Sequence, residues 1–450
     1  MRRLLPLLAL ALACGTGLVD HAGIDLSGLP DGGTQSDGGD GGTQSDGGTQ
    51  SDGGDGGNQA DGGGLPDGGS CEAPAHVCGG SCVPESTVSC GTQCAVCSQA
   101  DADSSCVSGG CAYECHPTFL HCAGGCCKTT AIAAGGDHTC AILGDNTVKC
   151  WGSNDRLQLG SSGPGSFSAV PVDLPGISGA TAIAAGAGQT CAIVSGGVKC
   201  WGNGAGVVDI AGLSSATQIA VGARHACAIT SAGVACWGAN DFGQLGDGSG
   251  AAGHANAAIV SGLGGATGLA LGLDHSCALV AGAVKCWGRG DNGRLGNSGT
   301  ASQPTPVAVD SLSNVAFIGS GERHTCAIVG TTASCWGAND QGQIVVGGGD
   351  QTKPKGLSGG LKARAIAGGS GFTCAIDTDN LLECPLGSSD SGQRATAGVA
   401  GLKKFALGSN HGCAIFADDG VKCWGKNDQG QLGTGSTSSF SATPVDVSGK

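Results

Sequence analysis

Aromatic and basic side chains are scarce in this sequence. Aromatic residues make up 3% of its 450 residues, and charged residues make up 13%. No Lys or Arg lies between Arg3 and Lys128, and the formal net charge is −15. A chain without a basic face has little to offer the phosphates of a nucleic acid. We therefore expect no nucleic-acid partner.

Long apolar runs are also missing. Crossing a bilayer as a helix takes about 20 apolar residues, whereas the longest run here covers only residues 4–13. This run follows two arginines and ends in small residues, which is the pattern of an export signal. The sequence therefore predicts a signal peptide over residues 1–14 and no transmembrane helix.

The end of this signal predicts a lipid anchor. Ala11, Leu12, Ala13 and Cys14 together resemble the lipobox of bacterial lipoproteins, in which the Cys is lipidated and becomes the first residue of the mature protein. The resemblance implies lipidation at Cys14, an outer-membrane or cell-surface location, and membrane contact through the anchor only. The alternative is an ordinary signal peptide and a secreted protein.

Glycine and cysteine, by contrast, are abundant, with 90 Gly and 27 Cys in the chain. So many Cys indicate an oxidising compartment, where disulfides persist. Residues 15–70 are rich in Asp-Gly-Gly repeats and contain no aromatic residue, Lys or Arg. Such a segment cannot bury enough apolar surface to fold, so we predict a disordered Gly/Asp-rich linker.

Residues 71–127 hold 12 Cys and scarcely any large apolar side chains. Cross-links must replace a hydrophobic core in such a segment, so we predict a small Cys-rich disulfide module. Cys94 and Cys97 have the spacing of half a zinc site, but the even number of Cys in an exported segment favours disulfides. The connectivity cannot be read from the sequence.

Residues 131–450 contain one phrase seven times. Each copy carries an HTCAI-like segment followed by a VKCWG-like segment, and the copies recur with a period near 45 residues. Short segments of alternating apolar and polar residues at such a period are typical of a β-propeller. We predict an all-β, seven-bladed β-propeller with four strands in each blade. The second and sixth repeats are short, so their blades should lack a strand or have minimal loops.

The two Cys of each copy are nine or ten residues apart. In a tight β-hairpin this spacing places them opposite each other, at a Cα separation of ~4.5–5.5 Å that a disulfide tolerates. We therefore predict seven disulfides within blades. The pairs are Cys140 with Cys150, Cys191 with Cys200, Cys227 with Cys236, Cys277 with Cys286, Cys326 with Cys335, Cys374 with Cys384, and Cys413 with Cys423.

The whole phrase, GxxHTxAI, VxxWG and GxNDxGQLG, resembles the repeat of the regulator of chromosome condensation family, a seven-bladed propeller. Residues 240–246 and 427–433 match its third part closely, and the resemblance covers about 320 residues. Two features depart from the family pattern. Cys occupies both variable positions of the hairpin, as suits an exported version, and Pro385 stands where the other copies have Trp.

One repeat position holds all six Trp and another holds five His. They are Trp151, Trp201, Trp237, Trp287, Trp336 and Trp424, and His138, His225, His275, His324 and His411. A ligand-stacking or light-sensing Trp cluster and a metal-binding His ring are the functional alternatives, although Gln189 and Phe372 interrupt the His series. We favour structural roles, with one Trp wedge per blade and each His hydrogen-bonded to a neighbouring loop.

No cluster of acid, base, nucleophile or metal ligands stands apart from the repeats. We therefore expect no catalytic residue, no cofactor and no metal site. Arg289, Gly290 and Asp291 spell a cell-adhesion tripeptide, but other copies place Ala-Asn-Asp or Lys-Asn-Asp at the same position. A turn explains these residues better than adhesion does.

Three functions remain. The first is a surface-tethered or secreted recognition propeller, a monomer that binds a protein or glycan without catalysis. We place its site on the loops after Trp151, Trp237, Trp287 and Trp336, which vary most between copies. The second, implied by the resemblance, is guanine-nucleotide exchange on a small GTPase, which export disfavours. The third is an extracellular propeller enzyme, a hydrolase or lyase, which fold alone does not exclude.

Closure of the ring needs a further element, because an open ring would expose unpaired strand edges. The first copy begins at Ala131, so we expect its blade to lack an outer strand. Residues 441–447 repeat the Pro-Val-x-Val pattern of residues 306–309. We expect them to pair in the blade that contains Cys140 and Cys150.

Overall fold

The computed structural model describes residues 119–122, 125–249, 253–344, 348–357, 362–387, 399–438 and 440–448, together with short strands between Val19 and Cys115. By their contacts, residues 1–29 and 115–450 form one compact unit and residues 30–114 another. In this described part, no helix is long and apolar enough to cross a membrane. The predicted signal peptide with Cys14, and nearly all of the linker over residues 15–70, lie outside the described residues.

The smaller unit contains two-stranded antiparallel pairs. β3 (Ala75–Cys78) pairs with β4 (Ser81–Pro84), and β5 (Val88–Cys90) pairs with β6 (Ala95–Cys97). β7 (Ala102–Val107) neighbours β8 (Gly110–Cys115) in a further two-stranded sheet. β1 (Val19–Asp20) and β2 (Gly23–Ile24), which pair with each other, belong to the larger unit. The pairing of the Cys between residues 71 and 111, including Cys94 and Cys97, lies outside the described residues.

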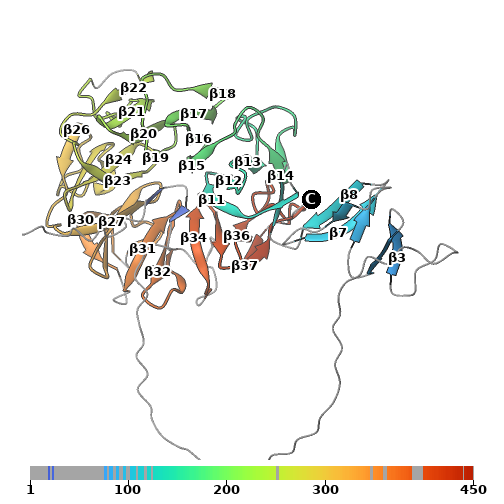
Figure 1. The fold of residues 1–450 in the computed structure, drawn as a ribbon. Coiled ribbons are helices and arrows are strands. Elements are labelled where there is room, and N and C mark those ends of the chain that lie inside the picture. The colour runs from blue at the N-terminus through green and yellow to red at the C-terminus, as the bar shows by residue number, and fades with distance from the viewer. Residues whose placement is uncertain are drawn as a thin grey trace, which may run out of the picture. The chain divides into compact units, whose positions relative to one another are not determined.

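The larger unit is a ring of seven blades, numbered 1 to 7 in chain order (Figure 1). Blades 1 to 3 are β11 (Thr129–Ala134), β12 (His138–Leu143), β13 (Val148–Ser153) and β14 (Phe167–Asp173); β15 (Ala180–Ala185), β16 (Gln189–Val194), β17 (Gly197–Gly202) and β18 (Ala205–Asp209); and β19 (Gln218–Val221), β20 (His225–Thr230), β21 (Gly233–Gly238) and β22 (His254–Ile259).

Blades 4 and 5 are β23 (Ala266–Leu271), β24 (His275–Val280), β25 (Ala283–Gly288) and β26 (Gln303–Ala308); and β27 (Val315–Ser320), β28 (His324–Val329), β29 (Thr332–Gly337) and β30 (Gln351–Gly356). Blades 6 and 7 are β31 (Ala363–Gly368), β32 (Phe372–Asp377) and β33 (Leu382–Gly387); and β34 (Leu402–Leu407), β35 (His411–Phe416), β36 (Val421–Lys426) and β37 (Phe440–Asp446). The predicted all-β, seven-bladed propeller is confirmed.

The two short repeats differ in structure. Blade 2 keeps four strands and has a minimal connection, because β17 ends at Gly202 and β18 begins at Ala205. Blade 6 shows three strands in the described part of the chain, and residues 388–398 after them lie outside it. The second repeat is therefore short because one of its loops is short, and not because a strand is missing.

The second and third strands of each blade form the hairpin that carries the paired Cys. Cys140 faces Cys150 across β12 and β13, for example. The Cα atoms of the seven cross-linked pairs lie 4.0–4.1 Å apart, close to the spacing of a pair that exchanges no backbone hydrogen bonds. The structure joins the same seven pairs that the hairpin spacing predicts.

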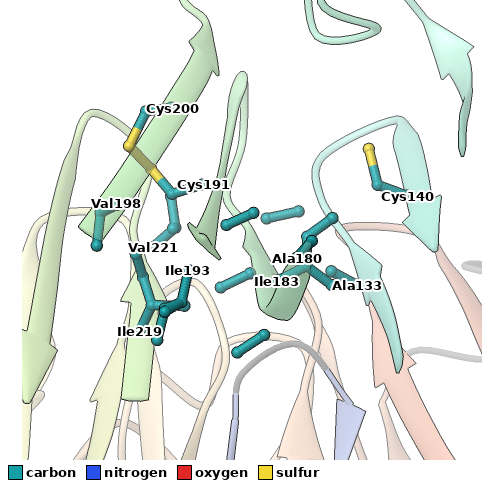
Figure 2. Close-up of a cluster of buried hydrophobic side chains, with 14 of the residues drawn as sticks. Ala133, Cys140, Ala180, Ile183, Cys191, Ile193, Val198, Cys200, Ile219 and Val221 are labelled. Atoms are coloured by element: carbon teal, nitrogen blue, oxygen red, sulfur yellow. A yellow bond between two sulfur atoms is a disulfide. The ribbon is translucent and has the colours of Figure 1, made fainter. Parts of the chain in front are cut away.

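The hydrophobic core lies between neighbouring blades. Figure 2 shows part of the cluster that joins blades 1, 2 and 3, in which Ala133, Ile183 and Ile219 come from successive blades. Separate clusters join blades 3 and 4, blades 4 and 5, blades 5 to 7, and blades 7 and 1. Since every junction is apolar, the blades are stabilised by their neighbours, as in other repeat proteins.

The ring closes without an exchanged strand, so the expectation for residues 441–447 is wrong. β14 is the outer strand of blade 1, and β37 pairs with β36 in blade 7, where Asp446 faces Lys422. Each blade begins with its inner strand and ends with its own outer strand. A repeat that starts at Ala131 is therefore already complete.

A cross-linked hairpin covers the junction of blades 7 and 1. β9 (Leu120–Cys122) pairs with β10 (Gly125–Cys127), and disulfides join Cys115 to Cys126 and Cys122 to Cys127. Leu120 is buried in the cluster that blades 1 and 7 share. The last part of the predicted Cys-rich module therefore belongs to the propeller unit.

Candidate binding face

The two faces of the ring carry different connections. Because the strands of a blade alternate in direction, the turn between its first and second strands lies on the same face as the loop between its third and fourth strands. We call this the loop face. The opposite face, the hairpin face, carries the cross-linked hairpin turns and the connections between blades. The predicted binding loops all lie on the loop face.

A closed set of hydrogen bonds joins blade 3 to blade 4 beneath the loop face. Nε2 of His225 lies 2.9 Å from Oγ of Ser276 in the next blade. Oγ of Ser276 and Nε1 of Trp287 both donate to the carbonyl oxygen of Gln244, at 3.0 and 2.9 Å. Because the Ser276 hydroxyl donates its proton to the Gln244 carbonyl, it must accept the hydrogen bond from Nε2–H of His225. Since Gln244 belongs to blade 3, each blade holds the other, and we call this set the inter-blade clamp.

The same clamp closes the ring between blades 7 and 1. Oγ1 of Thr139 lies 2.9 Å from Nε2 of His411 and donates to the carbonyl oxygen of Gln431 at 3.1 Å. Nε1 of Trp151 donates to that oxygen at 3.0 Å. The junction that joins the ends of the chain is therefore built like an internal one.

Three further junctions carry the clamp in whole or in part. The pairs are His138 with Thr190 and Trp201 with the Gln158 carbonyl, His275 with Thr325 and Trp336 with the Arg294 carbonyl, and His324 with Thr373, which donates to the Gln343 carbonyl. The expected structural roles of Trp and His are thus observed. The partner of each His is a hydroxyl on a strand of the next blade and not a loop.

The junctions after blades 2 and 6 are incomplete. Ala226 and Gly412 replace the hydroxyl residue there, and Gln189 and Phe372 replace the His. Nε2 of Gln189 donates to the backbone carbonyl of His225, but Nε1 of Trp424 has no acceptor among the described residues. These two junctions follow the two blades that have no described Gln-containing loop.

Burial keeps four of the clamp histidines neutral. It lowers the pKa of His138 and His324 to about 4 and that of His225 and His411 to about 3, with Arg224 and Arg323 adding to the effect at His225 and His324. Their Nε2 atoms are engaged with hydroxyls of the next blade. The arrangement fixes blades together and does not gather imidazoles around an ion.

Glycine three residues before each His is required by the packing of the imidazole. A Cβ atom on Gly135, Gly222, Gly272, Gly321 or Gly408 would lie 2.1–2.4 Å from Cε1 of the His in the same blade. No larger residue fits without moving the ring. The Gly and the His of the repeat phrase therefore form one structural unit.

Backbone hydrogen bonds link these turns around the axis. Gly136 N donates to Gly186 O at 3.1 Å, Leu273 N donates to Glu322 O at 2.9 Å, and Ser409 N donates to Gly135 O at 3.1 Å. The hollow at the axis encloses about 70 Å³. It has room for only a few water molecules, so it is too small for an organic ligand.

Each long loop divides into two halves. In blades 1, 3, 5 and 7 the first half contains a buried Asn whose Oδ1 accepts the backbone N–H five residues later, as Asn240 does from Leu245 at 3.0 Å. Asn154, Asn339 and Asn427 do the same. Blade 4 has Gly290 at this position. This half supplies the clamp carbonyl. The second half, such as residues 161–166 in blade 1, is mostly exposed. The second halves of the predicted binding loops are therefore open to a partner, together with exposed first-half side chains such as Asp155 and Arg156.

Several ion pairs lie on the loop face. Arg224 pairs with Asp241 at 2.5 Å and Arg323 with Asp340 at 2.8 Å, while Lys426 reaches Asp428 at 3.0 Å and Asp137 of blade 1 at 3.8 Å. Most cations of this face are therefore neutralised by a carboxylate of the chain itself.

The adhesion-like tripeptide is part of this pattern. Arg289 pairs with Asp291 of the same tripeptide at 2.8 Å and with Asp274 at 3.2 Å, and its guanidinium lies over the ring of Phe242. Asp291 also pairs with the buried Arg294. The turn interpretation is supported, since the arginine and the aspartate engage each other.

Blade 2 opens a notch in the loop face. Because its third and fourth strands are joined by two residues, a hollow of about 410 Å³ remains, lined by Asp155, Arg156, Asn203, Gly204 and Arg224. Arg156 is exposed and forms no ion pair with any described residue, unlike the other loop-face cations. Sequence reasoning missed this notch, although the short repeat was its signal.

Two groups of residues have metal-ligand geometry. They are Cys115, His121 and Cys126, and Cys122, Cys127 and Asp145. All four Cys are joined in disulfides, so their sulfurs are not thiolates and cannot serve as ordinary metal ligands. Neither group provides a metal centre in the oxidised chain.

Family comparisons match the repeats. Models of the Regulator of chromosome condensation (RCC1) repeat match residues 130–158, 216–244 and 402–431, and a second model of the same repeat matches residues 145–193 and 281–328. No curated protein matches the chain significantly by sequence.

Several solved structures are similar to this chain. Yeast RCC1 (Prp20), solved with Kap60, has 20% identity and a TM-score of 0.58, over 73% of this chain and 85% of that one. Prp20p from Saccharomyces cerevisiae, described with its binding to Gsp1p and histones, has 18% identity and a TM-score of 0.47 over 71% and 76%. The CRINKLY WD40 ectodomain of the Arabidopsis thaliana receptor kinase ACR4 has 20% identity and a TM-score of 0.43 over 66% and 98%.

Proposed function

We propose that this chain, which carries RCC1 repeats, is a recognition propeller that binds a protein or glycan at its loop face without catalysis. The division of each long loop into two halves carries the proposal. The first half is used inside the ring, where its carbonyl completes a clamp. The second half is mostly exposed and differs in sequence from blade to blade. Variable segments on a rigid scaffold are typical of binding loops.

We further propose that the chain works outside the cytosol as a lipoprotein. Nine disulfides in the described residues support an oxidising compartment. Lipid on Cys14 would hold the chain at a membrane, with residues 15–70 as the tether. A Cys14→Ser variant should move to the soluble fraction on cell fractionation. If it stays with the membrane, the anchor is wrong and the binding proposal is unaffected.

The second candidate is regulation of a small GTPase, which the similarity of the fold to yeast RCC1 suggests. Prp20p is described with its binding to Gsp1p and histones. Nucleotide exchange would require a cytosolic or nuclear chain, and its disulfides oppose that location. Release of labelled GDP from a purified small GTPase separates the candidates. We expect that the oxidised chain does not accelerate GDP release.

Site-specific photo-cross-linking tests the binding face. A photoreactive residue replaces Ser162, exposed in the second half of the blade 1 loop, or Ser231, exposed on the hairpin face of blade 3. Both positions are exposed serines, so they form a matched pair. After irradiation on intact cells, the Ser162 variant should form a discrete adduct and the Ser231 variant should not. Adducts at Ser231 alone, or at neither position, would refute the loop face as the site.

A further inference from the structure

The notch of blade 2 differs from the rest of the loop face in its charge balance. Arg224 donates one N–H to Asp241. Arg156, in contrast, has no carboxylate within 4 Å among the described residues. Asp155 also lines the hollow without pairing with Arg156. Two guanidinium groups thus border one hollow, and one of them is uncommitted.

The sequence beside the notch departs from the repeat at two adjacent positions. Phe242, Asn292, Gln341 and Gln429 occupy the position of Arg156 in other loops. At the next position Gly243, Gly293, Gly342 and Gly430 have φ of 72–80°, and blade 1 instead places Leu157 there with φ of 62°. A left-handed Leu is strained, because its Cβ atom crowds the following carbonyl oxygen.

The neighbouring blade explains how Leu157 fits. A Cβ on Gly243, Gly293 or Gly430 would come within 2.5–2.6 Å of the backbone of Pro304, Thr352 or Ala169 in the next outer strand. Blade 2 presents Gly206 at the corresponding register position, next to the Gly202–Ala205 pair. The shortened blade 2 and the Arg156-Leu157 pair are therefore parts of one local change.

We propose that this notch binds a carboxylate side chain of a protein partner, which enters between Arg156 and Arg224. The inference rests on the proposed function and names the chemistry of its site. A guanidinium presents parallel N–H donors that match the two oxygens of a carboxylate. Asn203 and Gly204 complete the lining. Gly204 N donates to the carbonyl oxygen of Arg156 at 2.8 Å, and Nδ2 of Asn203 donates to Oε1 of Gln189 at 3.0 Å, so this side of the hollow is held in place by the chain itself.

The surroundings favour an acidic peptide over a polyanion. Asp155 in the notch and Asp241 beside it offset much of the positive charge of the two arginines. A single carboxylate needs one uncommitted guanidinium, whereas a polyphosphate or nucleic acid needs a broad basic surface. The notch lining contains no aromatic side chain on which a sugar ring could stack. The partner is therefore a protein segment with an exposed Asp or Glu.

Arginine side-chain NMR tests the site directly. The full chain has nine arginines, so its Nε–Hε resonances can be assigned by substitution. The probe is acetyl-Gly-Glu-Glu-Gly-amide, with the Gln-for-Glu peptide as its control and inorganic tripolyphosphate as the polyanion. The Glu peptide should shift the Arg156 and Arg224 resonances saturably and leave that of Arg323 in place.

Two substitutions complete the test. Arg156→Gln should weaken peptide binding about fivefold or more, because it removes the uncommitted guanidinium. Arg323→Gln, which removes a paired cation of the same face, should leave binding unchanged. Equal shifts with the Gln peptide, tighter binding of tripolyphosphate, or an Arg156→Gln variant that binds normally would each overturn the proposal. None of these outcomes alters the cross-linking result at Ser162, so failure of the notch is distinct from failure of the binding face.

Discussion

The junction between blades 3 and 4 and the junction between blades 6 and 7 share a fold but not a set of contacts. In the first, His225, Ser276 and Trp287 satisfy one another through the Gln244 carbonyl. In the second, Phe372 replaces the His and Nε1 of Trp424 has no acceptor among the described residues. The second junction keeps its apolar packing and a backbone hydrogen bond from Ser370 N to Ser409 O at 3.0 Å, but it lacks the clamp.

The comparison shows that positions of the repeat in one blade depend on the blade before it. The hydroxyl residue is missing only in blades 3 and 7, as Ala226 and Gly412, and each follows a blade without a described clamp loop. Residues of one blade are therefore matched to the loop of the blade before.

Acidification should have the largest effect, because it acts on four His clamps at once. The pKa of four clamp His falls from 6.5 to about 3–4 on folding, so the unfolded chain binds more protons below pH 6.5. Stability is full above about pH 6.5 and declines as the pH falls toward 4. At pH 5 the loss is about 2 kcal/mol per His, or about 8 kcal/mol in all.

Urea denaturation between pH 8 and pH 5 measures this decline. His225→Gln keeps a polar side chain and removes one titrating group, so the pH dependence should become shallower by about one proton. A wild-type free energy of unfolding that stays constant over this range would contradict burial of neutral histidines.

Removing the Trp of the closing junction should have the next largest effect. Trp151 is fully buried and donates to Gln431, so Trp151→Ala should lower the free energy of unfolding by about 3–5 kcal/mol. Differential scanning calorimetry with disulfides intact gives the change. A variant that melts like the wild type would mean that the ring does not close through this contact.

The hydroxyl of the same clamp should have a smaller effect. Thr139→Ala leaves the Nε2–H of His411 without its acceptor and should cost about 1–3 kcal/mol. Thr139→Ser should restore most of this stability, because Ser276 fills the same role between blades 3 and 4. Chemical denaturation of the three chains checks both statements. Equal stability of the Ala and Ser variants would exclude the hydroxyl as the cause.

The smallest effect separates complete from incomplete junctions. Trp287→Phe loses both packing and a hydrogen bond, while Trp424→Phe loses packing and no hydrogen bond to any described residue. The first substitution should therefore cost about 1 kcal/mol more than the second. Denaturation of both variants in parallel provides the comparison. A larger loss at Trp424 would mean that its indole N–H is satisfied after all.

Much of the fold was predictable because its signals are local. Alternating segments around short turns specify hairpins, and the spacing of Cys140 and Cys150 specifies their register. Ring closure was not predictable in the same way, since the contact between Thr139 and His411 spans 272 residues. Both residues are visible in the sequence, but their hydrogen bond can be predicted only once blades 7 and 1 are known to be adjacent.

The candidate site was predictable only in part. Loops after Trp residues were rightly placed on one face, but their division into a buried half and an exposed half depends on how Asn240 and its equivalents bond inside the loop. Arg156 and Leu157 depart visibly from the repeat. Their importance follows from the short connection of the neighbouring blade, which a reading of one repeat at a time does not reveal.

Hydrogen–deuterium exchange of the full oxidised chain, alone and with the partner recovered through Ser162, tests the central claim most directly. The claim is that clamps fix the ring while the loop face binds. Protection should rise at Asp155 to Arg156, at Asn203 to Gly204 and in residues 161–166, with clamp strands unchanged. Protection confined to hairpin-face turns such as Ser195 to Gly196 and Ala281 to Gly282 would contradict it.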